Sequence, residues 1–145
     1  MKQTIKIELA DTSTEVLTKV VSDLETYPEW LDLVDKVEPE TDTEAWLVTL
    51  TAKIGPIKRS KKLRMVRKPA EKSTIFERQE THDRDFSSWV MQATVQPGES
   101  ENSAALTVDL SYDGSYWSSA LEAILEAKTP KVKKKLEAYL DQLDD

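Results

Sequence analysis

The segment Asp11-Thr-Ser-Thr-Glu-Val-Leu-Thr-Lys-Val-Val-Ser-Asp-Leu-Glu-Thr-Tyr-Pro-Glu-Trp-Leu-Asp-Leu-Val34 predicts two short helices in succession. Side-chain oxygens at 11–13 can cap a helix, and Thr12 and Glu15 have the spacing of a capping box. Apolar residues then recur at helical spacing over 16–24, which predicts a first helix with one apolar stripe. Tyr27 precedes a proline and is therefore disfavoured in helical geometry, so the first helix is expected to stop before it.

Pro28 suits the first turn of a new helix, because proline has no backbone N–H and that position needs none. We therefore expect the second short helix to begin at Pro28 and to continue through Leu33.

Predicted strands lie on both sides of this helical segment. Residues 4–9 alternate between apolar and charged side chains, which is typical of a strand with one wet face. The period of two returns after residue 35, and about seven strands are expected in all. The later ones cover 46–54, 57–68, 73–80, 86–95 and 104–112. Short turns between sequential strands favour an antiparallel meander.

Two runs at helical spacing follow the last strand, one beginning near Trp117 and the other near Val132. Thr129-Pro130 lies between them, and we expect either a kink there or a new helix capped by Thr129. The sheet has one apolar face, and this C-terminal helix is the element available to cover it. The predicted class is therefore α+β.

Length and composition limit the alternatives. A chain of 145 residues is expected to form a single domain, 1–145, and 39% hydrophobic with 32% charged residues fits a globular protein. The net charge of −7 disfavours general nucleic-acid binding, because an acidic surface repels phosphates. Cysteine is absent, and no apolar run reaches the ~20 residues of a transmembrane segment. Charges at Lys2, Lys6 and Glu8 interrupt the N-terminus, so we expect a cytoplasmic protein.

The chain resembles the START/SRPBCC superfamily, and within it the bacterial polyketide cyclase/dehydrase-like and coenzyme Q-binding-like proteins. The residues that carry the resemblance are Ala10-Asp-Thr-Ser-Thr-Glu-Val16 and Asp23-Leu-Glu-Thr-Tyr-Pro-Glu-Trp-Leu31, which resembles the family stretch D-x-x-x-Y-P-x-W. It implies the helix-grip fold, in which a curved antiparallel sheet wraps around a long C-terminal helix and leaves an apolar tunnel. With only three glycines, any bending of this sheet must come from bulges or twist at other residues.

The resemblance also implies an apolar small-molecule ligand, such as a lipid, quinone or polyketide-like compound, in a cavity between the sheet and the C-terminal helix. Strand and helix alternation would turn one set of side chains toward this cavity or toward an ordinary packed core. The expected ligand-binding residues are Trp46, Val48, Leu50, Leu63, Met65, Phe76, Arg78, Trp89, Met91, Val108, Leu110, Tyr112, Trp117 and Leu121.

Charged groups on inward-facing positions are candidates for a polar anchor. Arg78 and Glu80 share a face with Phe76, and Arg59 and Arg67 share the parity of the apolar positions in 57–68. Strand ends that reach solvent are the alternative explanation, and Arg78 is the preferred anchor.

Other chemistry has weaker support. The single histidine, His82, lies in a charged loop and is expected to be a solvated residue. No spacing indicates a metal site, a nucleophile or a resident cofactor, and none is expected. The basic run 58–68 and the lysines of 128–135 could contact anionic lipid or RNA, but such runs are usually solvated faces.

Three functions follow from these observations. The preferred one is non-catalytic binding or transport of an apolar small molecule. A cyclase/dehydratase-type enzyme is an alternative, which would need a buried acid or base such as Arg78 or Tyr112. A protein-interaction module is another, which would need a large exposed apolar patch.

Overall fold

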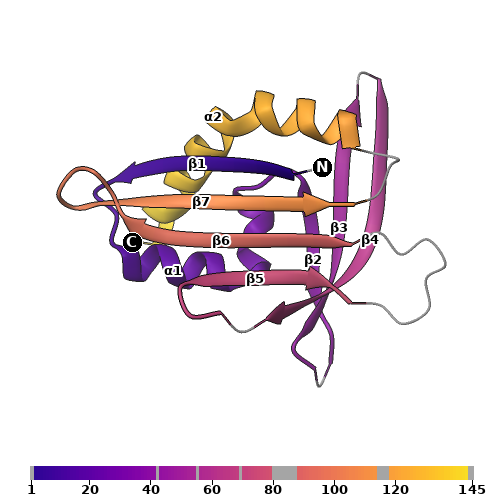
Figure 1. The fold of residues 1–145 in the computed structure, drawn as a ribbon, viewed down its shortest axis with the longest axis horizontal. Coiled ribbons are helices and arrows are strands. Elements are labelled where there is room, and N and C mark those ends of the chain that lie inside the picture. The colour runs from indigo at the N-terminus through magenta and orange to yellow at the C-terminus, as the bar shows by residue number, and fades with distance from the viewer. Residues whose placement is uncertain are drawn as a thin grey trace.

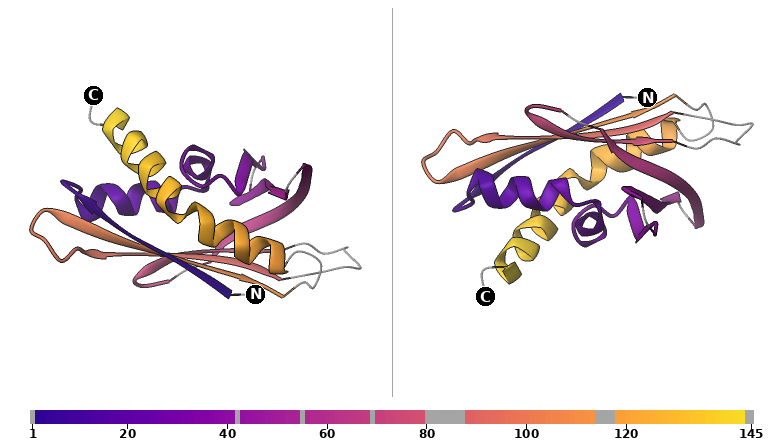
Figure 2. Two further views of the ribbon diagram at one scale, coloured as in Figure 1. Left: turned by 90° about the horizontal axis from the view of Figure 1, so that it is seen from above. Right: turned by 90° about the horizontal axis from the view of Figure 1, so that it is seen from below.

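The chain forms one antiparallel sheet with all its helices on the same side (Figures 1 and 2). This computed structural model describes residues 2–41, 43–54, 56–68, 70–79, 88–113 and 118–143, and the side chains of all these except 53, 54, 57, 59 and 118–129. The sheet has seven strands in the order β1-β7-β6-β5-β4-β3-β2. The predicted helix-grip arrangement is confirmed.

The strands lie close to the predicted ranges. They are β1 (Lys2–Ala10), β2 (Val34–Pro39), β3 (Ala45–Ile54), β4 (Ile57–Lys68), β5 (Ser73–Arg78), β6 (Trp89–Pro97) and β7 (Ser103–Tyr112). Consecutive strands from β2 to β7 pair as a meander, and β1 closes the sheet beside β7. The part of the predicted strand 86–95 that precedes Ser88 lies outside the described residues, as does His82.

The sheet is strongly curved. β2 and β3 run across the direction of β5, β6 and β7, and the long strand β4 bends between the two groups (Figure 1). The register of β2 against β3 shifts between Val34 and Lys36, which marks a bulge. A bulge increases the local twist without needing glycine, as the glycine-poor sequence predicts.

The first helix, α1 (Thr14–Ser22), begins where expected, but its cap differs from the predicted one. Ser13 is the N-cap residue, and its hydroxyl accepts a 3.1 Å hydrogen bond from the Val16 amide. Thr12 instead donates its hydroxyl to the Ala10 carbonyl. The capping oxygen therefore comes from residues 11–13, as predicted. The prediction that Thr12 and Glu15 form a capping box was wrong.

The second short helix was also predicted at the wrong place. It is the 3-10 helix η1 (Leu24–Glu29), which contains Pro28 rather than beginning at it. Asp23 explains the earlier start, because its carboxylate accepts a hydrogen bond from the Glu25 amide at 3.0 Å. The amides of Trp30 and Leu31 both bond to the Tyr27 carbonyl, so the missing N–H of Pro28 leaves this turn intact.

The C-terminal helix α2 (Ser118–Leu143) is one continuous helix through Pro130, so a new helix at Thr129 was wrong. Its described apolar side chains Val132, Leu136 and Leu140 are buried against the rest of the core. Proline removes one backbone hydrogen bond, and the packing of these side chains after Pro130 stabilises the helix against that loss. Among the described residues, no helix is long and apolar enough to span a membrane.

Four aromatic rings occupy the middle of the concave face, which is the side of the sheet that carries the helices. The rings of Tyr27 and Phe76 meet edge to face with centroids 5.7 Å apart, and Trp46 meets Phe76 at the same distance. The ring centroids of Trp30 and Tyr27 lie 4.5 Å apart. The Tyr27 hydroxyl donates a 2.8 Å hydrogen bond to the Val21 carbonyl, and burial raises the pKa of this phenol far above its ordinary value. The Tyr-Pro-Glu-Trp segment thus joins α1 to the sheet.

We expect Tyr27→Phe to lower the free energy of unfolding by about 1–2 kcal/mol, because it leaves a buried carbonyl near the end of α1 without its donor. Urea denaturation would measure this. Tyr139→Phe on α2, which alters a half-buried phenol, is the control and should change stability less. Equal losses in the two variants would contradict the proposed role of the Tyr27 hydroxyl.

Candidate functional site

The predicted ligand-binding residues are inward-facing, wherever the structure describes their side chains. Trp46, Val48, Leu50, Leu63, Met65, Phe76, Trp89, Met91, Val108, Leu110 and Tyr112 are buried in one continuous core on the concave face. Arg78 is also buried, with 5% of its surface exposed. Trp117 and the Leu121 side chain lie outside the described residues. The ligand contacts of all fourteen residues stay a prediction.

Three of these residues form a polar end row where β5, β6 and β7 reach the same end of the sheet. Trp89 pairs with Tyr112 across β6 and β7, and their rings lie 5.5 Å apart. Glu77 pairs with Val90, so continuing the register by one residue places Arg78 opposite Trp89. The end row therefore brings a guanidinium, an indole and a phenol to one end of a mostly apolar face.

The indole nitrogen of Trp89 is the unusual group in the end row. It is buried, and within the described part of the chain it has no hydrogen-bond partner. Leaving a buried donor unsatisfied costs about 1–3 kcal/mol, so native proteins seldom keep one without a reason. An acceptor oxygen placed here would recover that energy.

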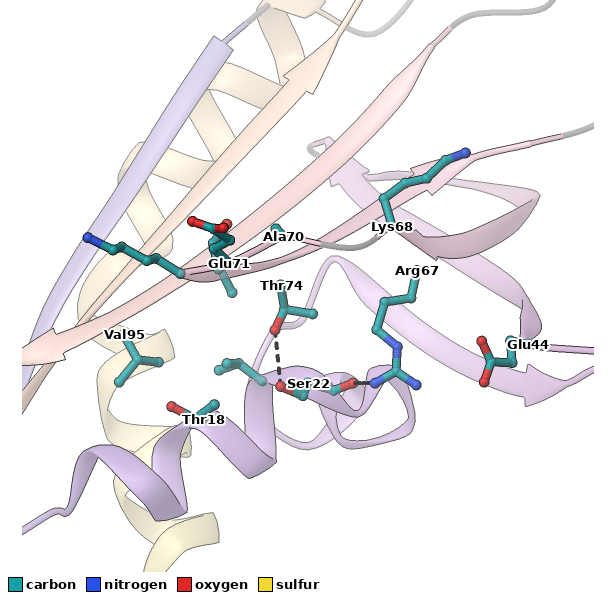
Figure 3. A pocket seen from close by; sticks show the side chains of 13 residues that line it. Thr18, Ser22, Glu44, Arg67, Lys68, Ala70, Glu71, Thr74 and Val95 are labelled. Carbon is teal, nitrogen blue, oxygen red and sulfur yellow. Dashed lines mark hydrogen bonds between the residues drawn. The ribbon is translucent and has the colours of Figure 1, made fainter.

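A pocket of about 540 Å³ lies at the opposite end of the concave face, beneath α1 (Figure 3). We call it the α1 pocket. Its wall and floor are formed by α1, β5 and β6 through Thr18, Val21, Ser22, Thr74, Ala93 and Val95. Its rim carries Glu44, Arg67, Lys68, Ala70, Glu71, Lys72 and Ser73.

Small inward-facing residues explain this hollow. Thr74 and Ala93 pair across β5 and β6, whereas the next inward pair, Phe76 and Met91, is bulky. The Ser22 and Thr74 hydroxyls hydrogen-bond each other at 3.0 Å and tie α1 to the sheet above the floor. None of the predicted ligand-binding residues lines this pocket, although the small side chains at 74 and 93 were a usable signal.

Arg67 occupies one end of the α1 pocket. Its Nη1 donates a 2.9 Å hydrogen bond to the Ser22 carbonyl, near the C-terminus of α1. Its guanidinium also lies over the Trp46 ring, 5.7 Å from the centroid. Parity had placed Arg67 among the inward-facing candidates, and the structure shows an exposed side chain that still borders a cavity.

Asp32 ties α2 to the segment between η1 and β2. Its carboxylate contacts the ammonium of Lys135 and, at 3.2 Å, that of Lys131. Burial pushes the pKa of Asp32 upward, but the hydrogen bonds and charges of these two lysines outweigh it and leave the pKa below its ordinary value. Two lysines of the predicted basic cluster in 128–135 therefore serve in part to hold α2 over the sheet.

Other chemistries find no support in the described residues. They contain no group of three or more acidic or histidine side chains that could hold a metal ion. Their exposed large apolar residues are Val16, Leu47 and Leu143, on three different elements. The large apolar patch that a protein-interaction module would need is therefore missing from this part of the surface.

Comparison with known proteins now identifies the class. The family described as "Polyketide cyclase / dehydrase and lipid transport" matches residues 13–137. The chain belongs to this family of the START/SRPBCC superfamily. No curated protein matches it.

Solved structures share the fold at low sequence identity. A START superfamily protein from Mycobacterium smegmatis is 19% identical, with 98% of each chain covered and a TM-score of 0.67. A conserved protein from Geobacillus kaustophilus is 12% identical, with a TM-score of 0.71 over 98% of this chain and 96% of that one. The di-domain ARO/CYC protein BexL from the BE-7585A biosynthetic pathway is 15% identical, with a TM-score of 0.62 over 94% of this chain and 46% of that one.

We expect Asp32→Asn to lower the free energy of unfolding by roughly 1 kcal/mol at pH 7, since solvent screens both lysines. The folded-state pKa of Asp32 is depressed, so its contribution is complete above the ordinary pKa and is lost as the pH falls through the folded value. Urea denaturation at about pH 7 and about pH 3 should therefore show a smaller difference from wild type in acid.

Glu38→Gln is the control for this experiment, because Glu38 pairs with Lys36 at 2.7 Å on a well-exposed surface. It should leave the urea midpoint nearly unchanged. A difference between wild type and Asp32→Asn that stays constant with pH would show that the carboxylate charge does not matter.

Proposed function

We propose that the chain binds an apolar small molecule, of the lipid, quinone or polyketide type, between the concave face and α2. The family to which the chain belongs supports this, as its description includes both polyketide cyclases and lipid transport. Burial of an apolar ligand provides about 25 cal/mol per Å² before ordering costs, so the apolar face supplies affinity and a few polar groups supply orientation.

The observation that carries the proposal is the end row of Arg78, Trp89 and Tyr112. A buried indole N–H that has no hydrogen-bond partner among the described residues weakens a core whose only task is packing, and Arg78 places a charged group in the same row. They suit a site in which an apolar body covers Met65, Met91 and Leu110 while an oxygen meets the end row. The two methionines suit ligands of varied shape.

The ligand is therefore expected to carry an acceptor oxygen, such as a ketone or quinone carbonyl. We test this with 9-fluorenone and fluorene, which differ in one carbonyl on the same apolar frame. Fluorenone should bind about three- to tenfold more tightly, the range of one net hydrogen bond. In ¹⁵N-labelled protein the indole cross-peak of Trp89, one of four, should shift with fluorenone only.

Trp89→Phe should abolish this preference and identifies the cross-peak, while Trp30→Phe should leave the preference intact. Trp30 is a suitable control because its indole, also buried, already donates to Thr26. Equal binding of the two probes with an unmoved Trp89 signal would refute the role of the end row. If neither probe binds, and a broad lipid and quinone panel also fails, the proposed function falls.

A cyclase/dehydratase-type enzyme is the second candidate, because the same row contains a buried cation and, on the far side of Trp89, a phenol. In that case Arg78→Met or Tyr112→Phe should lower the rate of cyclisation of a polyketide substrate far more than its binding. Equal effects on rate and affinity would favour binding alone.

A further inference from the structure

We propose that the α1 pocket is a second ligand site, which takes an amphipathic carboxylate. Arg67 binds the acid, and Val21, Ala93 and Val95 hold the apolar body. This site is distinct from the one proposed at the end row and does not depend on it.

The two sites lie at opposite ends of the concave face. Thr74 in the pocket floor and Arg78 in the end row are four residues apart on β5, which corresponds to about 13 Å along a strand. Phe76 lies between them, and its ring is packed edge to face against Tyr27 and Trp46. The aromatic cluster thus separates the α1 pocket from the end row, so one short ligand would not reach both.

The arrangement of side chains in the α1 pocket is amphipathic. Figure 3 shows the Arg67 guanidinium at one end, Thr18 and Val95 at the other, and the bonded Ser22 and Thr74 hydroxyls between them. Val21 and Ala93 line the pocket and are buried. The apolar body of a ligand placed against Val21 and Ala93 would cover side chains that belong to the core. The carboxylate of the same ligand would then meet Arg67.

Arg67 is held in place for this role. Its hydrogen bond to Ser22 and its position over the Trp46 ring fix the guanidinium, and they use only one of its five N–H donors. Within the described part of the chain, no carboxylate pairs with it. The remaining donors suit the two oxygens of a carboxylate, and prior immobilisation reduces the entropy lost on binding.

The charges at the rim decide how strongly the α1 pocket prefers a carboxylate to an uncharged ligand. Arg67, Lys68 and Lys72 line the pocket together with Glu44 and Glu71, and Lys68 is also paired with Glu77 at 3.3 Å. The lining residues alone carry one excess positive charge, and Glu77 offsets it at Lys68, so the preference for an acid depends on the position of Arg67 and not on a net positive rim. Glu44 lies toward the same end as Arg67 in Figure 3 and should oppose an anion there. A modest, salt-sensitive preference for acids follows.

The test uses 2-anthracenecarboxylate and the uncharged 2-anthracenemethanol as fluorescent probes of the full chain. Arg67→Met should weaken carboxylate binding about three- to tenfold and leave the alcohol nearly unchanged, as expected for an exposed charge-assisted contact. Glu44→Gln should tighten carboxylate binding by about two- to threefold. Arg64→Met is the matched control. Arg64 lies three residues before Arg67 on β4, its side chain is on the opposite face of the strand, and it pairs with Glu40 at 2.7 Å.

Ala93→Leu places the site, since a larger side chain in the pocket floor should weaken both probes. Urea midpoints show whether each variant is folded. If Ala93→Leu does not fold, Arg67→Met still decides the test. The proposal is overturned if the carboxylate does not bind, if Arg67→Met has no effect, or if Arg64→Met has the same effect. A shift of the Trp89 indole signal on carboxylate binding would also overturn it, and would point to the end row instead.

Discussion

The aromatic cluster of Tyr27, Trp30, Trp46 and Phe76 is the constraint on which the rest of the structure depends. Its rings come from η1, from the residue that follows it, and from two strands, β3 and β5. Edge-to-face contacts of this kind contribute beyond the area that they bury. Because the Tyr27 hydroxyl also reaches the Val21 carbonyl, the same cluster sets where α1 lies relative to the sheet.

The aromatic cluster fills the centre of the concave face, and the two ends of that face carry different kinds of side chain. At one end, the small side chains of Thr74 and Ala93 meet α1 across a hollow with charged residues at its rim. At the other end, Arg78, Trp89 and Tyr112 bring polar groups into a buried row. The hollow at the first end follows from short side chains at positions where the neighbouring inward pair, Phe76 and Met91, is bulky.

Curvature and the position of α2 complete the arrangement. The bulge in β2 and the bend of β4 turn the sheet around the helices, and Asp32 joins the loop after η1 to Lys131 and Lys135 on α2. These contacts connect parts of the chain that are far apart in sequence. They fix the position of α2 relative to the concave face.

Much of the fold follows from local sequence signals. The period of two in residues such as Leu106, Val108 and Leu110, together with the short turns, predicted the antiparallel sheet and its buried face. The Tyr-Pro-Glu-Trp segment indicated the family. The errors lie at helix boundaries, where the Asp23 cap moved η1 ahead of Pro28 and tertiary packing carried α2 through Pro130.

The sequence by itself thus determined which side chains face inward, because alternation depends only on neighbouring residues. Only the tertiary structure decided which of them are packed and which border open space. That outcome depends on how the volumes at 74, 76 and 93 meet side chains from α1 and η1. The sequence shows that the side chains at 74 and 93 are small, but not that they pair with each other beneath α1. The same holds for the indole N–H of Trp89, because its lack of a partner among the described residues is a property of the assembled core.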